Sequence, residues 1–464
     1  MSYLQRVRAP LRAWATIAVS ALAMAASGAA WCAQTEALAP GFTLVRSLGG
    51  IDEYRLDGNG LTVLLSPDHS VPVVTMQVTY RVGSRNEVTG TTGATHLLEH
   101  MMFKGSKSYD PKMGNGISTY MARVGAQYNA TTGQDSTSYY GTLAPENLEG
   151  YMAIEADRMR NLLLREEDRQ SEMTVVRNEY EQGENDPSES LNKEAEALAF
   201  LAQPYHHSVI GWRSDIENVP IAKLREFHDT FYWPNNAAVI LVGDFESQNA
   251  LAMVRKLFGG IPRAPHAIPV VYTQEPPQTG PRRAVVKRAG ALGAMTLLYK
   301  VPSALDADLP ALDVLGSILT SGEVHGLRKA LVDSSIASEA QAGVGLTRDP
   351  GVFTVDAWLA LGVTHEQLEK AVLATIERIK KDGVTAEELA QVVSRYRASE
   401  AFRRDGPEGV VDGLSEWLVV GDWTRFVTFV DSVAKVTPAD VQRVAQKYLN
   451  TDQSTTAWFV PVES

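Results

Sequence analysis

The segment His96-Leu97-Leu98-Glu99-His100 constrains the fold of this chain more than any other. On a helix, positions i, i+3 and i+4 lie on one face, so His96, Glu99 and His100 converge while Leu97 points elsewhere. Neutral imidazole nitrogens are good zinc ligands, and the i, i+4 spacing places both within reach of one ion. The neighbouring carboxylate can then take a proton from a water molecule at the metal without binding the metal itself. The segment therefore predicts a helix that carries a metal site.

The alternative is a chance cluster on an ordinary amphipathic helix. The chain has only nine histidines in 464 residues, so chance would give this pattern in about one chain in a hundred. The flanking residues favour the metal site, because Thr91-Thr92-Gly93 is a suitable helix start and Met101-Met102-Phe103 continues the helix with apolar side chains. Ionisable groups within such an apolar helix are costly unless they have partners.

The start of the chain differs in composition from the rest. Arg6, Arg8 and Arg12 form a basic region, and residues 13–30 are almost wholly small and apolar. This pattern predicts a secretory signal peptide over residues 1–33. An uncleaved membrane anchor is the alternative, and it is less favoured because the apolar run is rich in Ala rather than Leu.

The number of cysteines indicates the cellular compartment, and the net charge limits the classes of binding partner. Cys32, inside the predicted leader, is the only cysteine, so the folded part has neither a disulfide nor a thiolate ligand. Export without disulfides suits a bacterial periplasm. Loss of the three leader arginines would take the formal net charge from −12 to about −15. This charge argues against nucleic acid as a partner and leaves a peptide substrate open.

Strands and helices alternate along the whole chain. Residues 72–82 show the period-2 alternation of a strand with one buried face, and other strands are predicted from apolar or Thr/Tyr-rich runs. The other predicted strands are 61–66, 125–132, 137–143, 237–242, 295–301, 352–359 and 455–462. The predicted helices begin at about 145 and 385 or cover 166–184, 309–319, 326–332 and 364–380, the last with Thr364 as its cap.

The recurrence of strands and helices in both halves predicts two related α+β domains. Residues 261–283 contain six prolines, which indicates a linker between domains. We therefore expect an N-terminal domain over residues 45–260, which carries the metal site, and a C-terminal domain over residues 284–464. The second half contains no comparable His/Glu cluster, so we expect no metal site there.

A catalytic zinc needs a third protein ligand, and a carboxylate from another helix is a common source. Glu172 and Glu179 are seven residues apart, so they face the same way on the helix predicted at 166–184. We interpret this helix as apolar enough to pack inside the protein. Two stacked glutamates on a buried helix would then require a role such as metal binding. The alternative is a solvated face, because other acidic residues lie nearby. From spacing alone, either glutamate could be the ligand.

These features together resemble the M16 family, the inverzincin peptidases that include pitrilysin and the mitochondrial processing peptidase. The resemblance rests on the His96–His100 motif, on the glutamate helix some eighty residues later and on the proline-linked second half. It extends over Gly125–Tyr140, Pro204-Tyr205 with Ile210-Gly211, and Tyr232–Asp244. The length is similar to that of the half-length M16B members that pair as dimers. The resemblance implies that each domain is a mainly antiparallel sheet packed with helices.

The resemblance also implies a role for each motif residue. His96, His100 and Glu179 would bind one Zn²⁺ per chain, and Glu99 would be the general base. Glu172 matches the carboxylate that orients a zinc-bound histidine. The same ligand set would also accept manganese or cobalt.

Substrate binding is implied at two further places. Asn129 and Ala130 match the edge strand against which the family lays its substrate, where backbone pairing accepts many sequences. The alternative for these two residues is an ordinary strand. In the second half Arg328 begins the stretch in which the family has an Arg and, seven residues later, a Tyr that stabilise the substrate oxyanion. Here the Tyr position is Ser335, which departs from the family pattern.

The sequence therefore predicts an exported, periplasmic zinc metalloendopeptidase that hydrolyses peptides or unfolded segments. Two related subunits, as a heterodimer or a homodimer, would close around the substrate. The main alternative is a zinc-bearing subunit or scaffold of a heterodimer, which is inactive until a partner supplies the Arg/Tyr pair. A non-proteolytic metal-binding periplasmic protein is disfavoured because such a site does not require Glu99.

Overall fold

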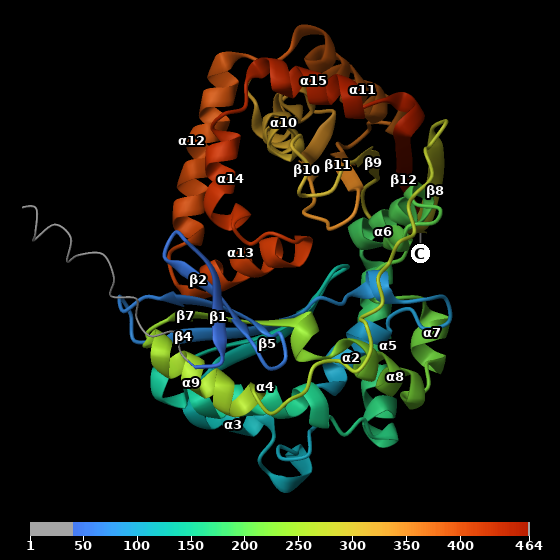
Figure 1. Ribbon diagram of the computed structural model, residues 1–464. Coiled ribbons are helices and arrows are strands. Elements are labelled where there is room, and N and C mark those ends of the chain that lie inside the picture. Colours follow the sequence, from blue (N-terminus) through green and yellow to red (C-terminus); the bar gives the residue numbers. More distant parts are fainter. Residues whose placement is uncertain (1–39, 463–464) are drawn as a thin grey trace, which may run out of the picture.

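The computed structural model describes residues 40–462, which form two units, each built on one sheet (Figure 1). In spatial order the first sheet contains β1 (Phe42–Leu48), β2 (Ile51–Leu56), β3 (Thr62–Pro67), β7 (Ala237–Gly243), β4 (Val74–Tyr80), β6 (Thr137–Leu143) and β5 (Gln127–Thr132). The second contains β10 (Ala337–Val344), β11 (Gly351–Leu359), β9 (Ala294–Val301), β12 (Ser454–Val462) and β8 (Arg282–Ala289). Each sheet is antiparallel except for one parallel pair, β3 with β7 and β8 with β12. The predicted α+β class with two mainly antiparallel sheets is confirmed.

Helices surround both sheets and supply most of the remaining structure. The chain before residue 259 contains α2 (Ala94–Met101), α3 (Ile117–Val124), α4 (Leu148–Asn161), α5 (Glu166–Asn185), α6 (Pro187–Ala199), α7 (Arg213–Asn218), α8 (Ile221–Phe231) and α9 (Ser247–Phe258). The second half contains α10 (Leu309–Ser321), α11 (His365–Asp382), α12 (Ala386–Arg403), α13 (Pro407–Val420), α14 (Arg425–Val433) and α15 (Pro438–Tyr448). Within residues 40–462, no helix is both long and apolar enough to cross a membrane. The predicted signal peptide and Cys32 lie outside the described residues.

The two units exchange a helix each. Helix α6, from the first half of the chain, packs on β8, β9 and β12 of the second sheet. Helix α13, from the second half, packs on β4 and β7 of the first sheet. Figure 1 shows α6 beneath the second sheet and α13 above the first. Each sheet therefore completes its hydrophobic core with a segment that lies on the other side of the linker in sequence.

This exchange corrects the expectation for β4, which was one buried and one exposed face. All seven residues of β4 are buried, because α13 covers the face that carries Thr75, Gln77 and Thr79. The Thr79 hydroxyl lies 2.9 Å from the Ser415 hydroxyl of α13. Buried polar groups require such partners. The alternation correctly predicted the strand, but polar side chains on one face did not mean that this face is solvated.

One local prediction, the helix cap at Thr364, is confirmed, and others need correction. Thr364 caps α11 by accepting a hydrogen bond from the backbone N–H of Gln367, at 3.3 Å. The helix predicted at 326–332 is a short π-helical turn, Arg328–Val332. Strands β1, β2, β8 and β10 were not predicted, because they lack a clear apolar alternation. Residues 259–281, between α9 and β8, contain no helix or strand.

A buried polar network also joins the units. Asp135, in the turn between β5 and β6, accepts hydrogen bonds from the Tyr205 hydroxyl, at 2.8 Å, and from the backbone N–H of Arg348, at 3.0 Å. Its carboxylate lies 3.2 Å from the Arg85 guanidinium, and Arg85 also pairs with Asp349. Arg348 and Asp349 belong to the loop between β10 and β11, so the β5–β6 turn contacts the second unit directly.

Candidate metal centre

Helix α2 begins where a glycine allows the chain to turn sharply. Gly93, the residue before the helix, has φ +82°, and a Cβ added there would lie 2.4 Å from the Ile210 carbonyl oxygen. Both the backbone conformation and the close approach therefore require glycine. The Glu87 carboxylate accepts hydrogen bonds from the backbone N–H groups of Gly93 and Thr95, at 2.8 and 2.7 Å. These bonds satisfy N–H groups at the start of the helix, which have no intrahelical partner.

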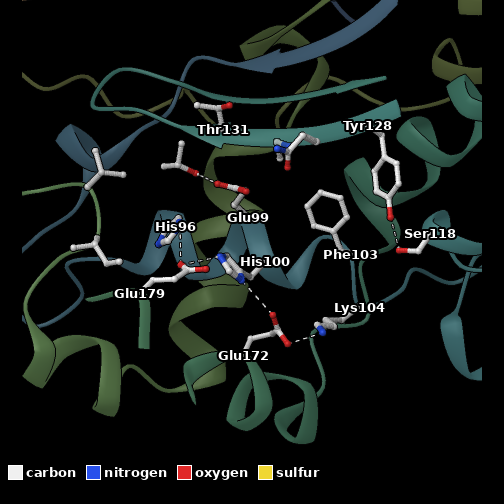
Figure 2. A pocket seen from close by; sticks show the side chains of 15 residues that line it. His96, Glu99, His100, Phe103, Lys104, Ser118, Tyr128, Thr131, Glu172 and Glu179 are labelled. Carbon is white, nitrogen blue, oxygen red and sulfur yellow. Dashed lines mark hydrogen bonds and ion pairs between the residues drawn. The ribbon is translucent and has the colours of Figure 1, made fainter. Parts of the chain in front are cut away.

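The two histidines of α2 converge with one glutamate of α5. The Glu179 Oε2 atom lies 3.7 Å from His96 Nε2 and 3.5 Å from His100 Nε2. Within residues 40–462 these three side chains form a group whose ligand atoms all lie within 4.8 Å of one another. Figure 2 shows both imidazole rings directed toward the Glu179 carboxylate. The structure thus brings together the three residues predicted as ligands.

The environment of His96 favours the neutral form of its imidazole. Burial, with a smaller contribution from the nearby His100, lowers the pKa of His96 to about 4. A neutral imidazole is the form that binds a metal ion. The donor set of two imidazoles and one carboxylate, with an open cavity beside it, fits a catalytic zinc site.

Glu172 lies one layer behind the histidines. Its Oε2 atom is 3.2 Å from His100 Nδ1, and its Oε1 atom is 2.5 Å from Lys104 Nζ. Glu172 is thereby placed to hold the ring of His100 with Nε2 directed at Glu179. The expectation of an apolar helix here is wrong. Of the twenty residues of α5, only Glu172 and Val176 are buried, and Met173 and Tyr180 pack partly buried against the core.

Glu99 extends from α2 toward β5 and is not part of the three-residue group (Figure 2). Its Oε2 atom accepts a hydrogen bond of 2.7 Å from the Thr132 hydroxyl. Burial raises the pKa of this carboxyl, although the Thr132 bond opposes the shift. Thr132 was not singled out from the sequence. Only the alternation of the strand, which places Ala130 and Thr132 on the face toward α2, could have suggested it.

A cavity of about 810 Å³ opens in front of these side chains. One wall is β5, which forms the edge of the first sheet and pairs with β6 alone among the described strands. Asn129 and Ala130 line the cavity from this strand, and Phe103 and Tyr128 add aromatic surface. An extended chain could therefore pair with the free edge of β5 beside the metal ligands.

Arg328 is not brought to this cavity. It lies exposed on the π-helical turn of the second half, and it does not line the cavity. Ser335, seven residues later, is exposed and has a φ of +53°. The predicted role of Arg328 in substrate binding stays a prediction.

Comparisons with known proteins place this fold in the peptidase class. A family model described as insulinase (peptidase family M16) matches residues 62–212, and one described as peptidase M16 inactive domain matches residues 218–396. The chain is 33% identical over 408 residues to zinc protease PqqE of Helicobacter pylori, across 87% of this chain and 91% of the relative. The chain belongs to the M16 peptidase family.

Other relatives and solved structures agree with this assignment. An uncharacterized zinc protease of Streptomyces coelicolor is 25% identical over 90% of this chain and 92% of its own length. The crystal structure of a protease from Helicobacter pylori superposes with a TM-score of 0.84 at 31% identity and covers 89% of this chain and 100% of that one. The periplasmic protease PqqL of Escherichia coli shares the fold, with a TM-score of 0.73 at 19% identity over 90% of this chain and 48% of that one.

Proposed function

We propose that this chain is an exported zinc metalloendopeptidase that hydrolyses peptides or unfolded segments. The convergence of His96, His100 and Glu179 beside Glu99 at one cavity carries the proposal. When bound, a zinc ion supplies a Lewis acid that polarises the scissile carbonyl and acidifies water. The names of relatives as zinc proteases support zinc as the metal. We propose one ion per chain, because His96, His100 and Glu179 form a single ligand group.

The residues of the chain would then divide the reaction between them. Glu99, held by the Thr132 hydroxyl, takes a proton from the attacking water and passes it to the leaving amine. Glu172 orients His100. The edge of β5 at Asn129 and Ala130 holds the substrate backbone in an extended conformation, which aligns the scissile bond without selecting a sequence.

We further propose that residues 1–33 are a cleaved leader. Residues 45–260 and 284–464 would form two domains, joined by the linker. A periplasmic location is supported by the leader composition and by the periplasmic protease that shares the fold.

A second candidate is a zinc-bearing subunit that is active only with a related partner. The exposed position of Arg328, away from the cavity, favours this candidate, because an Arg that binds substrate would then act on the cavity of a neighbouring subunit. A homodimer and a heterodimer are both compatible with this arrangement.

The decisive experiment measures cleavage of an unfolded casein substrate by the mature chain at known zinc content, beside Glu99→Gln at the same zinc content. We expect the wild type to cleave and Glu99→Gln to lose at least about a hundredfold in rate while it retains zinc. One zinc per chain without cleavage by either protein would favour the partner-dependent subunit. Absence of bound zinc in the wild type would contradict the proposal.

A further inference from the structure

The third ligand of the proposed site stands on a helix that has little apolar anchorage. Helix α5 carries Glu172 and Glu179, yet Val176 is its only buried apolar residue. A surface helix usually takes its position from an apolar stripe that packs on the core. On α5 this stripe is narrow, because Val176 is accompanied only by the partly buried Met173 and Tyr180. Polar contacts at the start of α5 therefore also contribute to how it lies over α2.

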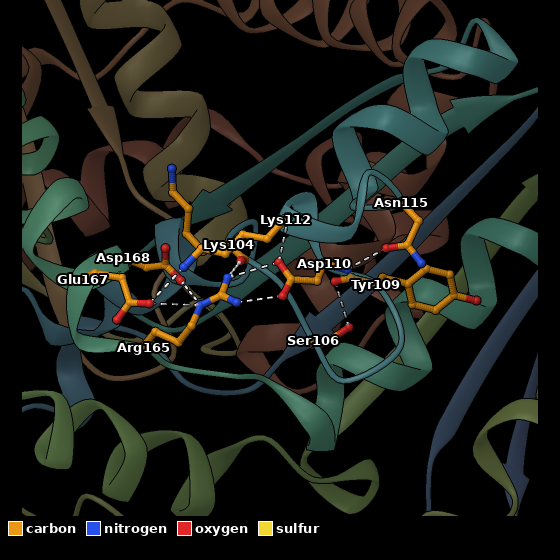
Figure 3. A network of polar contacts seen from close by, with 9 residues as sticks. All are labelled: Lys104, Ser106, Tyr109, Asp110, Lys112, Asn115, Arg165, Glu167 and Asp168. Carbon is orange, nitrogen blue, oxygen red and sulfur yellow. Dashed lines mark hydrogen bonds and ion pairs between the residues drawn. The ribbon is translucent and has the colours of Figure 1, made fainter.

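Arg165, the residue directly before α5, makes polar contacts with several separate segments (Figure 3). Its Nη2 donates to the Lys104 carbonyl oxygen at 2.7 Å, and its Nη1 donates to Asp110 Oδ2 at 2.7 Å. Its Nε donates to Asp168 Oδ2, in the first turn of α5, at 2.6 Å. One planar guanidinium thus bonds three separate segments at the same time.

The hydrogen bond from Arg165 to the Lys104 carbonyl oxygen connects α5 to the segment that follows α2. Lys104 follows α2 by three residues, and its side chain bonds Glu172. The backbone alongside is also paired, because Lys107 N–H donates to the Asn161 carbonyl at 2.9 Å and Leu163 N–H donates to that of Gly105 at 3.1 Å. These backbone bonds hold the chain up to residue 163. Arg165 extends the connection into the first turn of α5.

We propose that Arg165 is a positioning residue for the metal centre. By fixing the start of α5 to the end of α2, it sets where Glu179 lies relative to His96 and His100, although it contacts none of the three. This inference rests on the metal site proposed above. Lysine cannot replace the guanidinium fully, because a single ammonium cannot present donors to three such separated acceptors.

The test compares zinc affinity, by competition with a chromophoric chelator, in wild type, Arg165→Ala, Arg165→Lys and Lys112→Ala. Lys112 is the matched control, because it pairs with Glu167 of the same helix turn at 2.9 Å but is exposed. We expect about a tenfold or greater loss of affinity for Arg165→Ala and a smaller loss for Arg165→Lys. Lys112→Ala should stay within about twofold of wild type.

The visible absorption of the cobalt-loaded proteins gives a second readout that loss of stability alone would not change. We expect altered band positions or intensities in both Arg165 variants, since the geometry of the ligands shifts. Unchanged zinc affinity and an unchanged cobalt spectrum in folded Arg165→Ala would overturn the inference. If that variant does not fold, the same result in Arg165→Lys would overturn it. A wild type that binds no zinc would instead remove the proposed site itself.

Discussion

Glu99 differs from the other carboxylates near the histidines because it accepts a hydrogen bond from the Thr132 hydroxyl. Glu172 and Glu179 contact imidazole nitrogens, whereas Glu99 accepts its hydrogen bond from a strand on the far side of α2. This contact restricts the rotamer of Glu99 and keeps its second oxygen free for a proton. The residue that would transfer protons is therefore positioned by the strand that would bind the substrate.

Replacement of Thr132 by Val keeps the shape of the side chain but removes the donor. We expect kcat for peptide cleavage to fall about tenfold, because general base catalysis depends on placement of the carboxylate. The zinc content and KM should change little, since the Thr132 hydroxyl bonds Glu99 and not the three ligand residues, and the substitution leaves the backbone of β5 unchanged. Steady-state kinetics on zinc-loaded protein provide the measurement.

Thr132→Ser is the control, because it retains a hydroxyl at the same position. Its kcat should remain within about threefold of wild type. Equal losses in the two variants would show that packing, and not the hydrogen bond to Glu99, accounts for the effect.

The sequence was sufficient for contacts within one helix and insufficient for contacts between elements. His96, Glu99 and His100 follow from helical spacing, and the structure places all three at one cavity. The choice between Glu172 and Glu179 came from the family resemblance, because spacing gives both residues the same face. Lys104, Thr132 and Arg165 remained invisible, because each acts across a distance in sequence that only the tertiary fold closes.

At the scale of elements, the helix exchanged between the units explains why β4 is polar on a buried face. The Thr79 hydroxyl receives a hydrogen bond from the Gln77 amide at 2.9 Å and lies 3.0 Å from the hydroxyl of Ser138. It also contacts Ser415 of α13 at 2.9 Å. A periodic pattern in one strand cannot reveal that a helix more than three hundred residues later will cover it.

Thr79→Val tests this buried polar contact between strand and helix. We expect the free energy of unfolding to fall by about 1–3 kcal/mol, because the substitution leaves polar partners buried without a hydrogen bond. Urea denaturation followed by circular dichroism measures the change. Thr43→Val, at the exposed Thr43–Asp57 pair, should cost less than about 0.5 kcal/mol. An equal cost at both positions would contradict the role of α13 as a polar cover.

At the scale of the whole molecule, exchanged helices and the Asp135 network make the two units depend on each other. Leu191 of α6 is 2% exposed and belongs to a core cluster with Leu298 and Phe459 of the second sheet. Removal of α6 from its place would expose the second sheet, although α6 precedes the linker. The two units should therefore unfold together, even though a chain of this length commonly unfolds in stages.

Leu191→Ala tests this coupling by creating a cavity under the second sheet with a substitution in the first half. We expect the free energy of unfolding to fall by about 2–5 kcal/mol. Hydrogen exchange across a urea series, read on peptides from β7 and β9, should show both strands losing protection at the same lowered urea concentration. Val175→Ala, at a position 40% exposed on α5, should shift neither strand by more than about 0.5 kcal/mol. If Leu191→Ala shifts β9 alone, the units are independent, and a substrate held on β5 would receive no support from the second half.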